Sequence, residues 1–470
     1  YISTWRMFTV RRRSLLLSKY ILQPNHLSTR ICLTMDPSPP SLLIAPDQQG
    51  LISAAEDIAK GNLVAFPTET VYGLGANALD ASAVLSIFEA KGRPLTDPLI
   101  VHVHDIQSAK QLISVSPETE RVFMLLANQF WPGPLTIIVK AASCVPMVVT
   151  ADTGYVGIRM PAHPLALEFL KACRLPIAAP SANRFGHVSP TRAQHVLDDL
   201  GNKGVRVLDG DSAHASFTCL HGIESTVLRI NAEDSSVTIL RQGAISQRDV
   251  AGLLKGEGLS EWVVKAIHRA IKHTSASTTD TVASGEEPAV APGQLLTHYA
   301  PDVPCYVLAS AVISPDVSTY EHLSYPPPES EEAVREQMQR YTQSSLLLSS
   351  AQMKSDVVVI DFQGQLRALA SGCLAYRDLS PSGNMTEAAR GLFAALRWSE
   401  LVPQAGKVIL APIVTCADKS GMEPVDRSVG SLDAQSSPSL NKSYDPELGL
   451  ADRILRAASG VAIELVINED

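Results

Sequence analysis

Hydrophobic and polar positions alternate with a regular period in two regions of the chain. From about residue 50 to 255, short apolar runs alternate with amphipathic stretches, which is typical of a mixed α/β domain. After residue 301 the pattern returns on a smaller scale, with buried strands expected at 303–308, 357–362 and 407–411. The chain therefore predicts two α/β domains, the second one smaller and built on a parallel sheet.

The spacing of apolar residues also predicts where the elements lie. Strands are expected at 63–66, 98–103, 135–139, 156–160, 177–179, 205–208, 225–230 and 237–240. Helices are expected at 81–91, 117–130, 164–173, 191–200 and 246–256, and in the second region at 384–397 and 447–458. Asp80 should cap helix 81–91, with Val84, Leu85 and Phe88 on its inner face.

Polar sequence separates the two regions. Residues 274–288 lack an apolar period and predict a linker. We therefore expect a first domain over 48–258, a linker and interdomain loop over 259–301, and a second domain over 302–470. The segments near 323–333 and 420–446 are rich in Pro, Ser and charge and favour surface insertions.

The first 34 residues have a composition of their own. They contain six Arg or Lys and no acidic residue. One interpretation is a mitochondrial transit peptide, which would add a mitochondrial form to a cytoplasmic one. The other is an extension that is not translated, because Met35 follows where the basic character ends.

Bulk composition limits the classes of function. The net charge is −9, and outside the first 34 residues 33 basic residues face 48 acidic ones, which argues against broad, charge-driven binding of nucleic acid. The seven cysteines are scattered singly without a CxxC pair, so we expect a reducing compartment and no zinc site. No apolar stretch is long enough to cross a membrane, and no GxxxxGK[ST] phosphate loop is present.

The segment 65–75 carries the strongest chemical signal. An apolar strand stops at Pro67 and leads into hydroxyls, an acid and glycines, which would place polar groups at a sheet edge where ligands bind. Lys91 and Arg93 follow one helix later and add two cations, so the region indicates a site for a phosphorylated small molecule. The alternative is that Gly73 and Gly75 only form a turn and that the cations only cap a helix.

Further strand residues have the right chemistry for a ligand. In strand 156–160, Gly157 and Arg159 share a face, and the planar guanidinium suits a carboxylate or phosphate, unless it is a surface arginine paired with an acid. His102 shares a face with Ile100, and a histidine on a strand is more often a hydrogen-bonded structural residue than a catalyst. Ser181 lies outside any GxSxG elbow, so covalent serine catalysis is not supported.

Several motifs occur in one order along the chain. They are Lys-Gly-Arg at 91–93, Trp-Pro-Gly-Pro-Leu-Thr at 131–136, Ile-Arg-Met-Pro at 158–161, Pro-Ser-Ala-Asn at 180–183, Glu-Ser-Thr at 224–226 and Leu-Arg-Gln-Gly at 240–243. Together they resemble the YrdC-domain family of threonylcarbamoyl-AMP synthases, in its long form. The resemblance is dense over about 50–250, continues in 291–301 and is fainter beyond. It implies a YrdC-like twisted mixed sheet with an open concave cleft, followed by a smaller Rossmann-like α/β domain.

The resemblance implies a nucleotidyltransferase. Its reaction joins L-threonine, bicarbonate and ATP into threonylcarbamoyl-AMP and pyrophosphate, the first step of N6-threonylcarbamoyladenosine formation in tRNA. Such a reaction needs positioning and positive charge more than covalent catalysis, with Mg²⁺ on the phosphates. A separate tRNA threonylcarbamoyl transferase complex would consume the product.

The resemblance also implies roles for individual residues. Lys91 and Arg93 would be the catalytic cations. The threonine pocket would consist of Thr68, His102, Arg159, Ser181, Ser225 and Thr226. Arg159 would hold the carboxylate, and His102 would bind the amino acid and not act as a general base. ATP would contact Lys91, Arg93, Thr136, Tyr155, Asn183, Ser189, Arg241 and Tyr299. Residues 294–301 resemble the interdomain loop that lies over the family's cleft, and Tyr299 is the expected lid contact, unless it only packs the domain junction.

Two other functions compete with this interpretation. The first is an RNA-binding or ribosome-associated factor, including one for double-stranded RNA. The acidic balance and the lack of interleaved aromatic residues argue against it. The second is a carbamoyl-handling acyltransferase of the same superfamily that uses carbamoyl-AMP. It would be accompanied by a zinc-finger module, which the scattered cysteines exclude.

Overall fold

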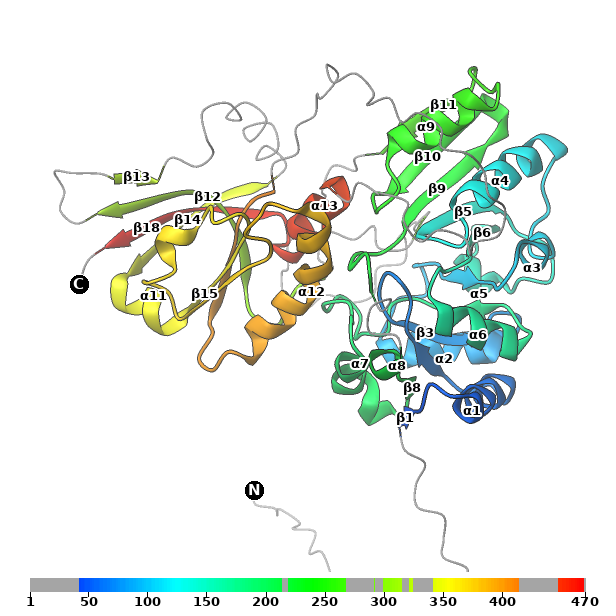
Figure 1. Cartoon of the computed structure of the whole chain (residues 1–470), viewed down its shortest axis with the longest axis horizontal. Coiled ribbons are helices and arrows are strands. Elements are labelled where there is room, and N and C mark those ends of the chain that lie inside the picture. Colours follow the sequence, from blue (N-terminus) through cyan, green and yellow to red (C-terminus); the bar gives the residue numbers. More distant parts are fainter. Residues whose placement is uncertain are drawn as a thin grey trace, which may run out of the picture. The chain divides into compact units, whose positions relative to one another are not determined.

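The computed structural model describes residues 42–213, 219–267, 291, 299–314, 321–323, 341–413 and 447–468 (Figure 1). The basic extension 1–34, the linker 274–288 and the segment 420–446 lie outside these ranges, as does 324–333 of the other expected insertion. The described residues form two sheets, one in each of the two regions that the sequence pattern predicts.

The first sheet has eleven strands in the order β1-β8-β2-β3-β7-β4-β6-β5-β9-β10-β11 and mixes parallel with antiparallel pairs. Its strands are β1 (Leu43–Ile44), β2 (Val64–Phe66), β3 (Gly73–Asn77), β4 (Ile100–His102), β5 (Leu135–Lys140), β6 (Tyr155–Arg159), β7 (Ile177–Ala178), β8 (Arg206–Leu208), β9 (Thr226–Asn231), β10 (Ser236–Arg241) and β11 (Val263–Ala266). The expected mixed α/β fold is confirmed. The sheet also includes β1 and β11, on either side of the range 48–258.

Helices cover both faces of this sheet. They are α1 (Gln48–Ala59), α2 (Ala81–Lys91), α3 (Ile106–Lys110), α4 (Pro117–Phe130), α5 (Met147–Thr150), α6 (Pro164–Cys173), α7 (Ala193–Leu200), α8 (Gly210–Ala213) and α9 (Gln247–Gly256). The helices belong to two separate hydrophobic clusters. One cluster includes residues of α2, α4, α7 and α9, and the other contains residues of α1 and α6 packed with Phe66. No helix in the described ranges combines the length and apolarity needed to cross a membrane.

Helix α2 begins as the sequence predicts. The Asp80 side chain accepts hydrogen bonds from the backbone N–H groups of Ser82 and Ala83, at 2.9 and 3.2 Å, and so satisfies two N-terminal donors. The predicted inner face is partly wrong. Leu85 is 46% exposed, whereas Ile87 is fully buried, because the rotation of 100° per residue carries position 85 away from the sheet.

The glycines at 73 and 75 belong to a strand and not to a turn. β3 pairs antiparallel with β2, with Phe66 opposite Gly73. A Cβ at Gly75 would lie 2.9 Å from Ile177 Cγ2 and 3.0 Å from the Val64 carbonyl oxygen. Only glycine allows so close an approach. The interpretation of these glycines as a simple turn is therefore wrong, and the polar segment 67–72 connects the ends of two interior strands, β2 and β3.

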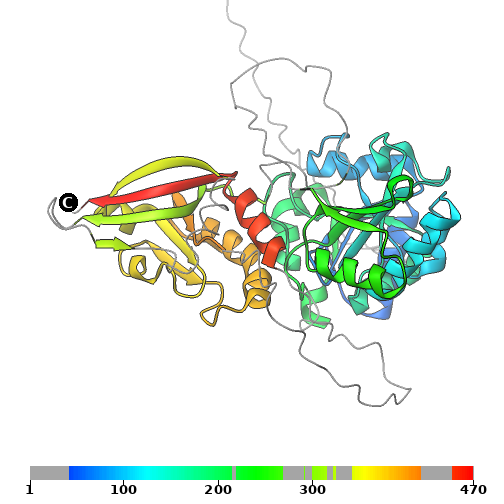
Figure 2. The same ribbon diagram turned by 90° about the horizontal axis from the view of Figure 1, so that it is seen from above.

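The second sheet has seven strands, with β14-β18-β12-β17-β15-β16 in order and β13 beside β12. They are β12 (Cys305–Ser314), β13 (Glu321–Leu323), β14 (Thr342–Ser349), β15 (Val357–Asp361), β16 (Ala375–Asp378), β17 (Lys407–Leu410) and β18 (Val461–Asn468). Helices α11 (Ser350–Asp356), α12 (Met385–Leu401) and α13 (Glu447–Ala457) accompany them. Every pair except β12–β13 is parallel, as expected, and β12, β14 and β18 run side by side (Figure 2).

Helices of the second domain meet the first domain at glycines. Gly222 has a φ of +66°, and a Cβ built there would overlap the backbone of Arg390 in α12. A Cβ at Gly449 in α13 would lie 2.7 Å from Ile223 Cδ1 and 3.1 Å from Gly243 Cα. The helices therefore pack directly on Gly222 and Gly243, with no room for a side chain at these two contacts.

Gly222→Ala should therefore destabilise the protein by about 2–4 kcal/mol, because it combines a strained φ with an overlap. The matched control is Gly204→Ala. Gly204 has a φ of +73° but open space around its Cβ position, so only the backbone strain of about 1–2 kcal/mol applies. Chemical denaturation measures both variants. Equal losses for the two would show that the contact between α12 and Gly222 is not tight.

Candidate active site

One pocket collects most of the polar residues that the sequence analysis selected. It is lined by Thr68, Thr70, Val71, Tyr72, Gly73, Arg93, Pro98, Ile100, His102, Arg159, Ala179, Pro180, Ser181, Glu224, Ser225, Arg241 and Tyr299. The topology explains the grouping. β4 and β6 are parallel neighbours with His102 opposite Arg159, and β7 and the β2–β3 segment flank them. Residues far apart in sequence therefore meet at one sheet edge.

Arg159 lies on the pocket wall as a buried cation. It is 4% exposed, and one terminal guanidinium nitrogen lies 2.6 Å from Glu69 Oε1. The arginine is thus paired with an acid, as the alternative interpretation holds, but it is not on the surface. Its Nε has no acceptor among the described residues, although it is buried. A buried donor without a partner is costly, so this N–H is available to a ligand oxygen.

Glu69 is a functional candidate that the sequence analysis did not select. Burial alone would raise the pKa of this carboxyl group, but the guanidinium of Arg159 outweighs burial and lowers the pKa. Glu69 is therefore an anion that fixes Arg159 in place. Its position between two hydroxyl residues in the polar segment 68–70 is the signal that could have identified it.

His102 has the protonation state of a binding residue. Burial and the neighbouring charge of Arg159 lower its pKa to about 3, although Glu69 opposes the shift. The imidazole is therefore neutral at physiological pH and too weak a base to remove a proton efficiently. The low pKa argues against a role as general base, and ligand binding by His102 remains a prediction.

Arg241 and Ser225 form a second polar corner of the pocket. Arg241 donates from Nε to the Ser225 carbonyl oxygen and from a terminal nitrogen to Ser225 Oγ, both at 3.1 Å. Behind them, Thr136 Oγ1 lies 2.8 Å from Ser225 Oγ. Thr136 does not itself line the pocket, so it supports Ser225 from below.

Lys91 and Arg93 are both buried, but only Arg93 lines the pocket. Lys91 Nζ donates to the carbonyl oxygens of Ser181 and Asn183 at 2.6 and 2.5 Å and lies 3.4 Å from Asn183 Oδ1. Burial, followed by repulsion from Arg93, lowers its pKa well below the ordinary value. The idea that Lys91 only caps α2 is wrong, because its ammonium group fixes the 181–183 segment. Arg93 lines the pocket and is 2.9 Å from Asp97 Oδ2.

Five other predicted contacts do not line the pocket in this structure: Lys91, Tyr155, Asn183, Ser189 and Thr226. Thr226 Oγ1 bonds to the Ile245 carbonyl oxygen on the core side, and Ser189 Oγ donates to Glu224 Oε1 at 2.6 Å. Tyr155 packs under the guanidinium of Arg229 at 3.9 Å, and Asn183 donates to the carbonyl oxygens of residues 184 and 187. Their predicted contacts to threonine or ATP remain predictions.

Tyr299 lies both in the pocket and at the domain junction, and its contact to a nucleotide remains a prediction. Its side chain is fully buried, lines the pocket and packs 5.3 Å from the ring of Phe393 in α12, measured between ring centroids. It is thus a pocket residue and a junction residue at once. Residues 292–298 of the same loop lie outside the described part of the chain.

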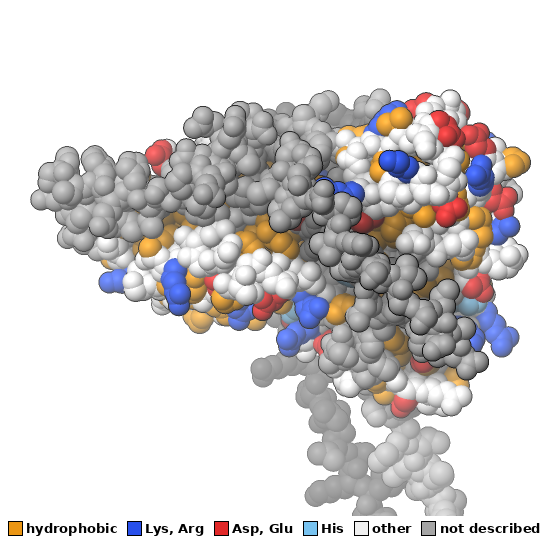
Figure 3. Space-filling model, turned by 45° about the horizontal axis from the view of Figure 1, so that its top comes forward, with side chains coloured by type: hydrophobic (Ala, Val, Ile, Leu, Met, Phe, Trp, Pro, Cys, Tyr) orange, Lys and Arg blue, Asp and Glu red, His pale blue; other side chains and the backbone are white. Residues whose placement is uncertain are grey.

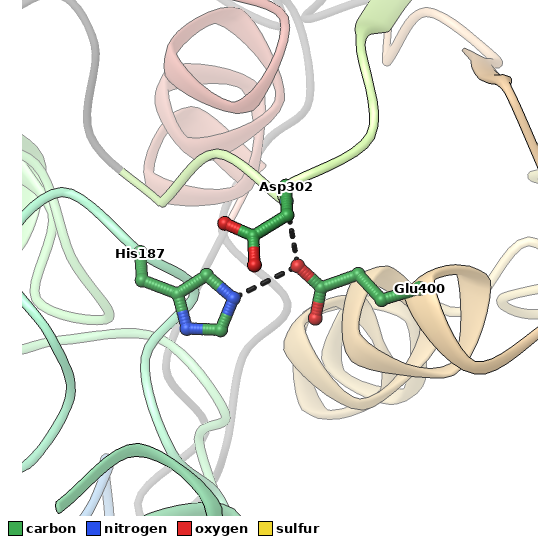
Figure 4. Close-up of side chains that lie close together, drawn as sticks. All are labelled: His187, Asp302 and Glu400. Carbon is green, nitrogen blue, oxygen red and sulfur yellow. Dashed lines mark hydrogen bonds and ion pairs between the residues drawn. The ribbon is translucent and has the colours of Figure 1, made fainter. Parts of the chain in front are cut away.

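A separate polar cluster, outside the lining of the pocket, joins the two domains; Figure 4 shows three of its residues, His187, Asp302 and Glu400. His187 bonds through Nδ1 to Asp199 Oδ2 at 3.0 Å and through Nε2 to Glu400 Oε1 at 2.8 Å. The Asp302 backbone N–H also donates to Glu400, at 2.7 Å. His187, Asp302 and Glu400 are close enough to suit a metal ion.

The charges of this junction cluster already have partners. Arg184 lies 2.9 Å from Asp302 Oδ2, and Arg397 lies 2.8 Å from Asp199 Oδ2. With a protonated His187, two arginines and one imidazolium face the three carboxylates of Asp199, Asp302 and Glu400. A proton on His187 therefore balances the cluster without a metal ion. No motif in the sequence predicts this arrangement, because its members are far apart along the chain.

The geometry defines an α/β protein with a pocket lined by three buried arginines, Arg93, Arg159 and Arg241. A family model described as "Telomere recombination" matches residues 56–243, and one described as "Threonylcarbamoyl-AMP synthase, C-terminal domain" matches 262–427. The threonylcarbamoyl-AMP synthase of Pyrococcus abyssi is 41% identical over 54% of this chain and 66% of its own length, just under two thirds. That of Xanthomonas campestris is 33% identical over 35% of this chain and 88% of its own length.

The solved structures agree with the sequence comparisons. The crystal structure of Pyrococcus abyssi Sua5 complexed with L-threonine matches with a TM-score of 0.62 and 28% identity, covering 90% of this chain and 99% of the other. The chain belongs to the threonylcarbamoyl-AMP synthase family, and the two-domain fold that the resemblance implies is confirmed.

The junction cluster makes stability depend on pH. Burial would lower the pKa of His187, but its hydrogen bonds to Asp199 and Glu400 outweigh burial and raise it. A raised folded-state pKa stabilises the protein below the unfolded value of about 6.5, and the stabilisation is lost as pH rises through the folded value. His187→Gln should therefore lower the melting temperature most at about pH 6, and less toward about pH 9.

The control for this prediction is His104→Gln. His104 Nε2 lies 3.1 Å from Asp105 Oδ2, outside the junction and partly exposed, so its loss should leave the melting temperature nearly unchanged. A loss for His187→Gln that is the same at every pH would contradict the charge balance described above.

Proposed function

We propose that this chain is an L-threonylcarbamoyladenylate synthase, which converts L-threonine, bicarbonate and ATP into threonylcarbamoyl-AMP and pyrophosphate. The observation that carries the proposal is Arg159, a buried guanidinium with an unused Nε–H in a pocket that also contains Arg93 and Arg241. A planar fork suits an amino-acid carboxylate, and the other two arginines suit phosphates. The family member from Pyrococcus abyssi that was solved with L-threonine supports the choice of amino acid.

The proposed chemistry has two steps. The threonine amine adds to bicarbonate and releases water, which gives an N-carboxylate. An oxygen of this carbamate then attacks the α-phosphorus of ATP, and the bond from that phosphorus to the bridging oxygen breaks, so that pyrophosphate leaves. The protein has to hold two anions in line and stabilise the negative charge on the phosphates, which cations can do without covalent participation.

The pocket residues divide this work. Arg159 would bind the threonine carboxylate, with Glu69 holding the guanidinium in place. The neutral His102 and the hydroxyls of Thr68, Ser181 and Ser225 would orient the amino acid. Because carbamates are short-lived in water, a buried site with Tyr299 over it would protect the intermediate.

Arg93 and Arg241 would face the triphosphate. Lys91 would act by fixing the 181–183 segment beside them. We also propose that Mg²⁺ enters on the ATP phosphates. Glu224 is the single carboxylate among the described lining residues, and its two oxygens already accept from Ser189 and Arg453. The described lining therefore does not suit a metal held by the protein itself, whereas Mg²⁺ is commonly held by substrate phosphates.

The product would pass to a tRNA threonylcarbamoyl transferase complex, since an acyl-adenylate is an activated donor. Weak contact with tRNA or other RNA is the remaining alternative. On the face drawn in Figure 3, basic side chains are scattered among acidic and apolar ones and form no broad field, which does not favour a charge-driven RNA surface.

The experiment that tests the proposal measures pyrophosphate release from ATP. Release should require both L-threonine and bicarbonate, and serine should replace threonine poorly. RNA binding without threonine-dependent release would contradict the proposal and favour the RNA-binding alternative.

Arg159→Lys should raise the KM for L-threonine by about 10- to 100-fold and leave the KM for ATP within about threefold, because lysine keeps the charge but loses the fork. The control is Arg206→Lys, since Arg206 is also paired with a carboxylate, Asp57, at 2.5 Å, but lies outside the pocket. An equal rise in KM for both variants would show that Arg159 does not bind threonine.

A further inference from the structure

An arginine of the second domain reaches the pocket of the first. Arg453 lies in α13 and is fully buried. Its Nε donates to Glu224 Oε2 at 2.9 Å, and one terminal nitrogen donates to the Gln242 carbonyl oxygen at 2.7 Å. Both acceptors lie next to predicted substrate contacts, because Ser225 follows Glu224 and Arg241 precedes Gln242. A single guanidinium therefore joins the two chain segments that form this corner of the pocket.

Both carboxylate oxygens of Glu224 accept a hydrogen bond in this arrangement. Its Oε1 accepts from Ser189 at 2.6 Å and its Oε2 accepts from Arg453, so each oxygen is fixed by a different segment. Glu224 lines the pocket beside Ser225. The position of the Glu224–Ser225 wall thus depends on a residue that lies more than two hundred positions away in the chain.

The backbone around Arg453 is too close-packed to adjust easily. Gly449, one turn earlier in α13, lies against Gly243, where its Cβ would be 3.2 Å from the Gly243 carbonyl oxygen. The Arg453 guanidinium also lies 5.3 Å from the centroid of the Tyr299 ring, within reach of a cation–π interaction. Arg453 consequently touches two lining residues, Glu224 and Tyr299, from one position.

A buried ion pair is, by itself, weak evidence of anything but packing. Here the partners of the arginine distinguish it from other contacts between the domains. Arg390 in α12 also bridges the domains, from Nε to the Leu220 carbonyl oxygen at 3.1 Å, but it is exposed and contacts no lining residue through that bond. Arg397 bonds to Asp199 in the junction cluster, which does not line the pocket.

We propose that Arg453 is a positioning residue through which the second domain holds the Glu224–Ser225 wall and Tyr299 in the geometry that binds substrate. This inference rests on the proposed synthase activity. It assigns the second domain a direct part in forming the pocket, beyond covering it.

The test compares kinetic constants of full-length variants by pyrophosphate release. Arg453→Lys keeps the positive charge but cannot bridge Glu224 and Gln242, and we expect it to raise the KM for L-threonine or ATP at least about fivefold. Arg390→Ala breaks a domain contact away from the pocket, and its KM values should stay within about twofold of the wild type. Melting temperatures are recorded for both variants, so that unfolding is distinguished from a changed pocket.

A double-mutant cycle separates positioning from simple stability. Arg453→Met would leave Glu224 buried and unpaired, so the same change is also made with Glu224→Gln, which removes both charges. If Arg453 acts through Glu224, Arg453→Met should raise the KM in the wild-type background by at least about fivefold, and by less than about twofold in the Glu224→Gln background.

Three results would overturn the inference. The first is that the KM values of Arg453→Lys stay within about twofold of the wild type. The second is that the KM rises as much for Arg390→Ala as for Arg453→Lys. The third is that the effects of the two substitutions in the double-mutant cycle are additive. If the wild type itself shows no threonine-dependent release, the proposed function fails, and this inference fails with it. Wild-type activity with unaffected Arg453 variants would overturn the inference alone.

Discussion

The structure depends on keeping several cationic side chains buried around one pocket. Lys91, Arg93, Arg159, Arg241 and Arg453 are each less than 10% exposed. Burying an unpaired charge is strongly unfavourable, so each needs fixed partners. Carboxylates hold Arg93, Arg159 and Arg453, and carbonyl oxygens hold Lys91 and Arg241. The cations and their partners come from different strand ends and from both domains. The whole set of cations is therefore stabilised around the pocket only when both domains are folded.

Under the proposed function, this arrangement lets the pocket bind anions although the chain as a whole is acidic. The chain as a whole has a net charge of −9, and positive charge is concentrated inside the pocket, where a low dielectric strengthens it. These partners hold the guanidinium group of Arg159 in place but leave its Nε–H without an acceptor among the described residues. Such preorganised charge is what a reaction between two anionic substrates requires.

The sequence predicted elements better than side-chain directions. The helices α2, α4 and α6 have the predicted limits, because caps and apolar periods are local properties. β3 was not predicted, since its glycines serve a close strand contact that is visible only in the sheet. Thr226 and Ser189 belong to motifs that predicted substrate contacts, but their hydroxyls form hydrogen bonds to other residues of the protein. Arg453 could not be predicted, because it lies in an ordinary amphipathic helix. Contacts across more than two hundred residues leave no local signal.

The most direct test of the account is to identify the product. Purified protein is incubated with ATP, L-threonine and carbon-13 bicarbonate, and the nucleotide products are analysed by mass spectrometry. The account predicts a single species that contains AMP, threonine and one labelled carbon, and that is absent when either threonine or bicarbonate is omitted. AMP formation without an adduct carrying both threonine and the label would contradict it.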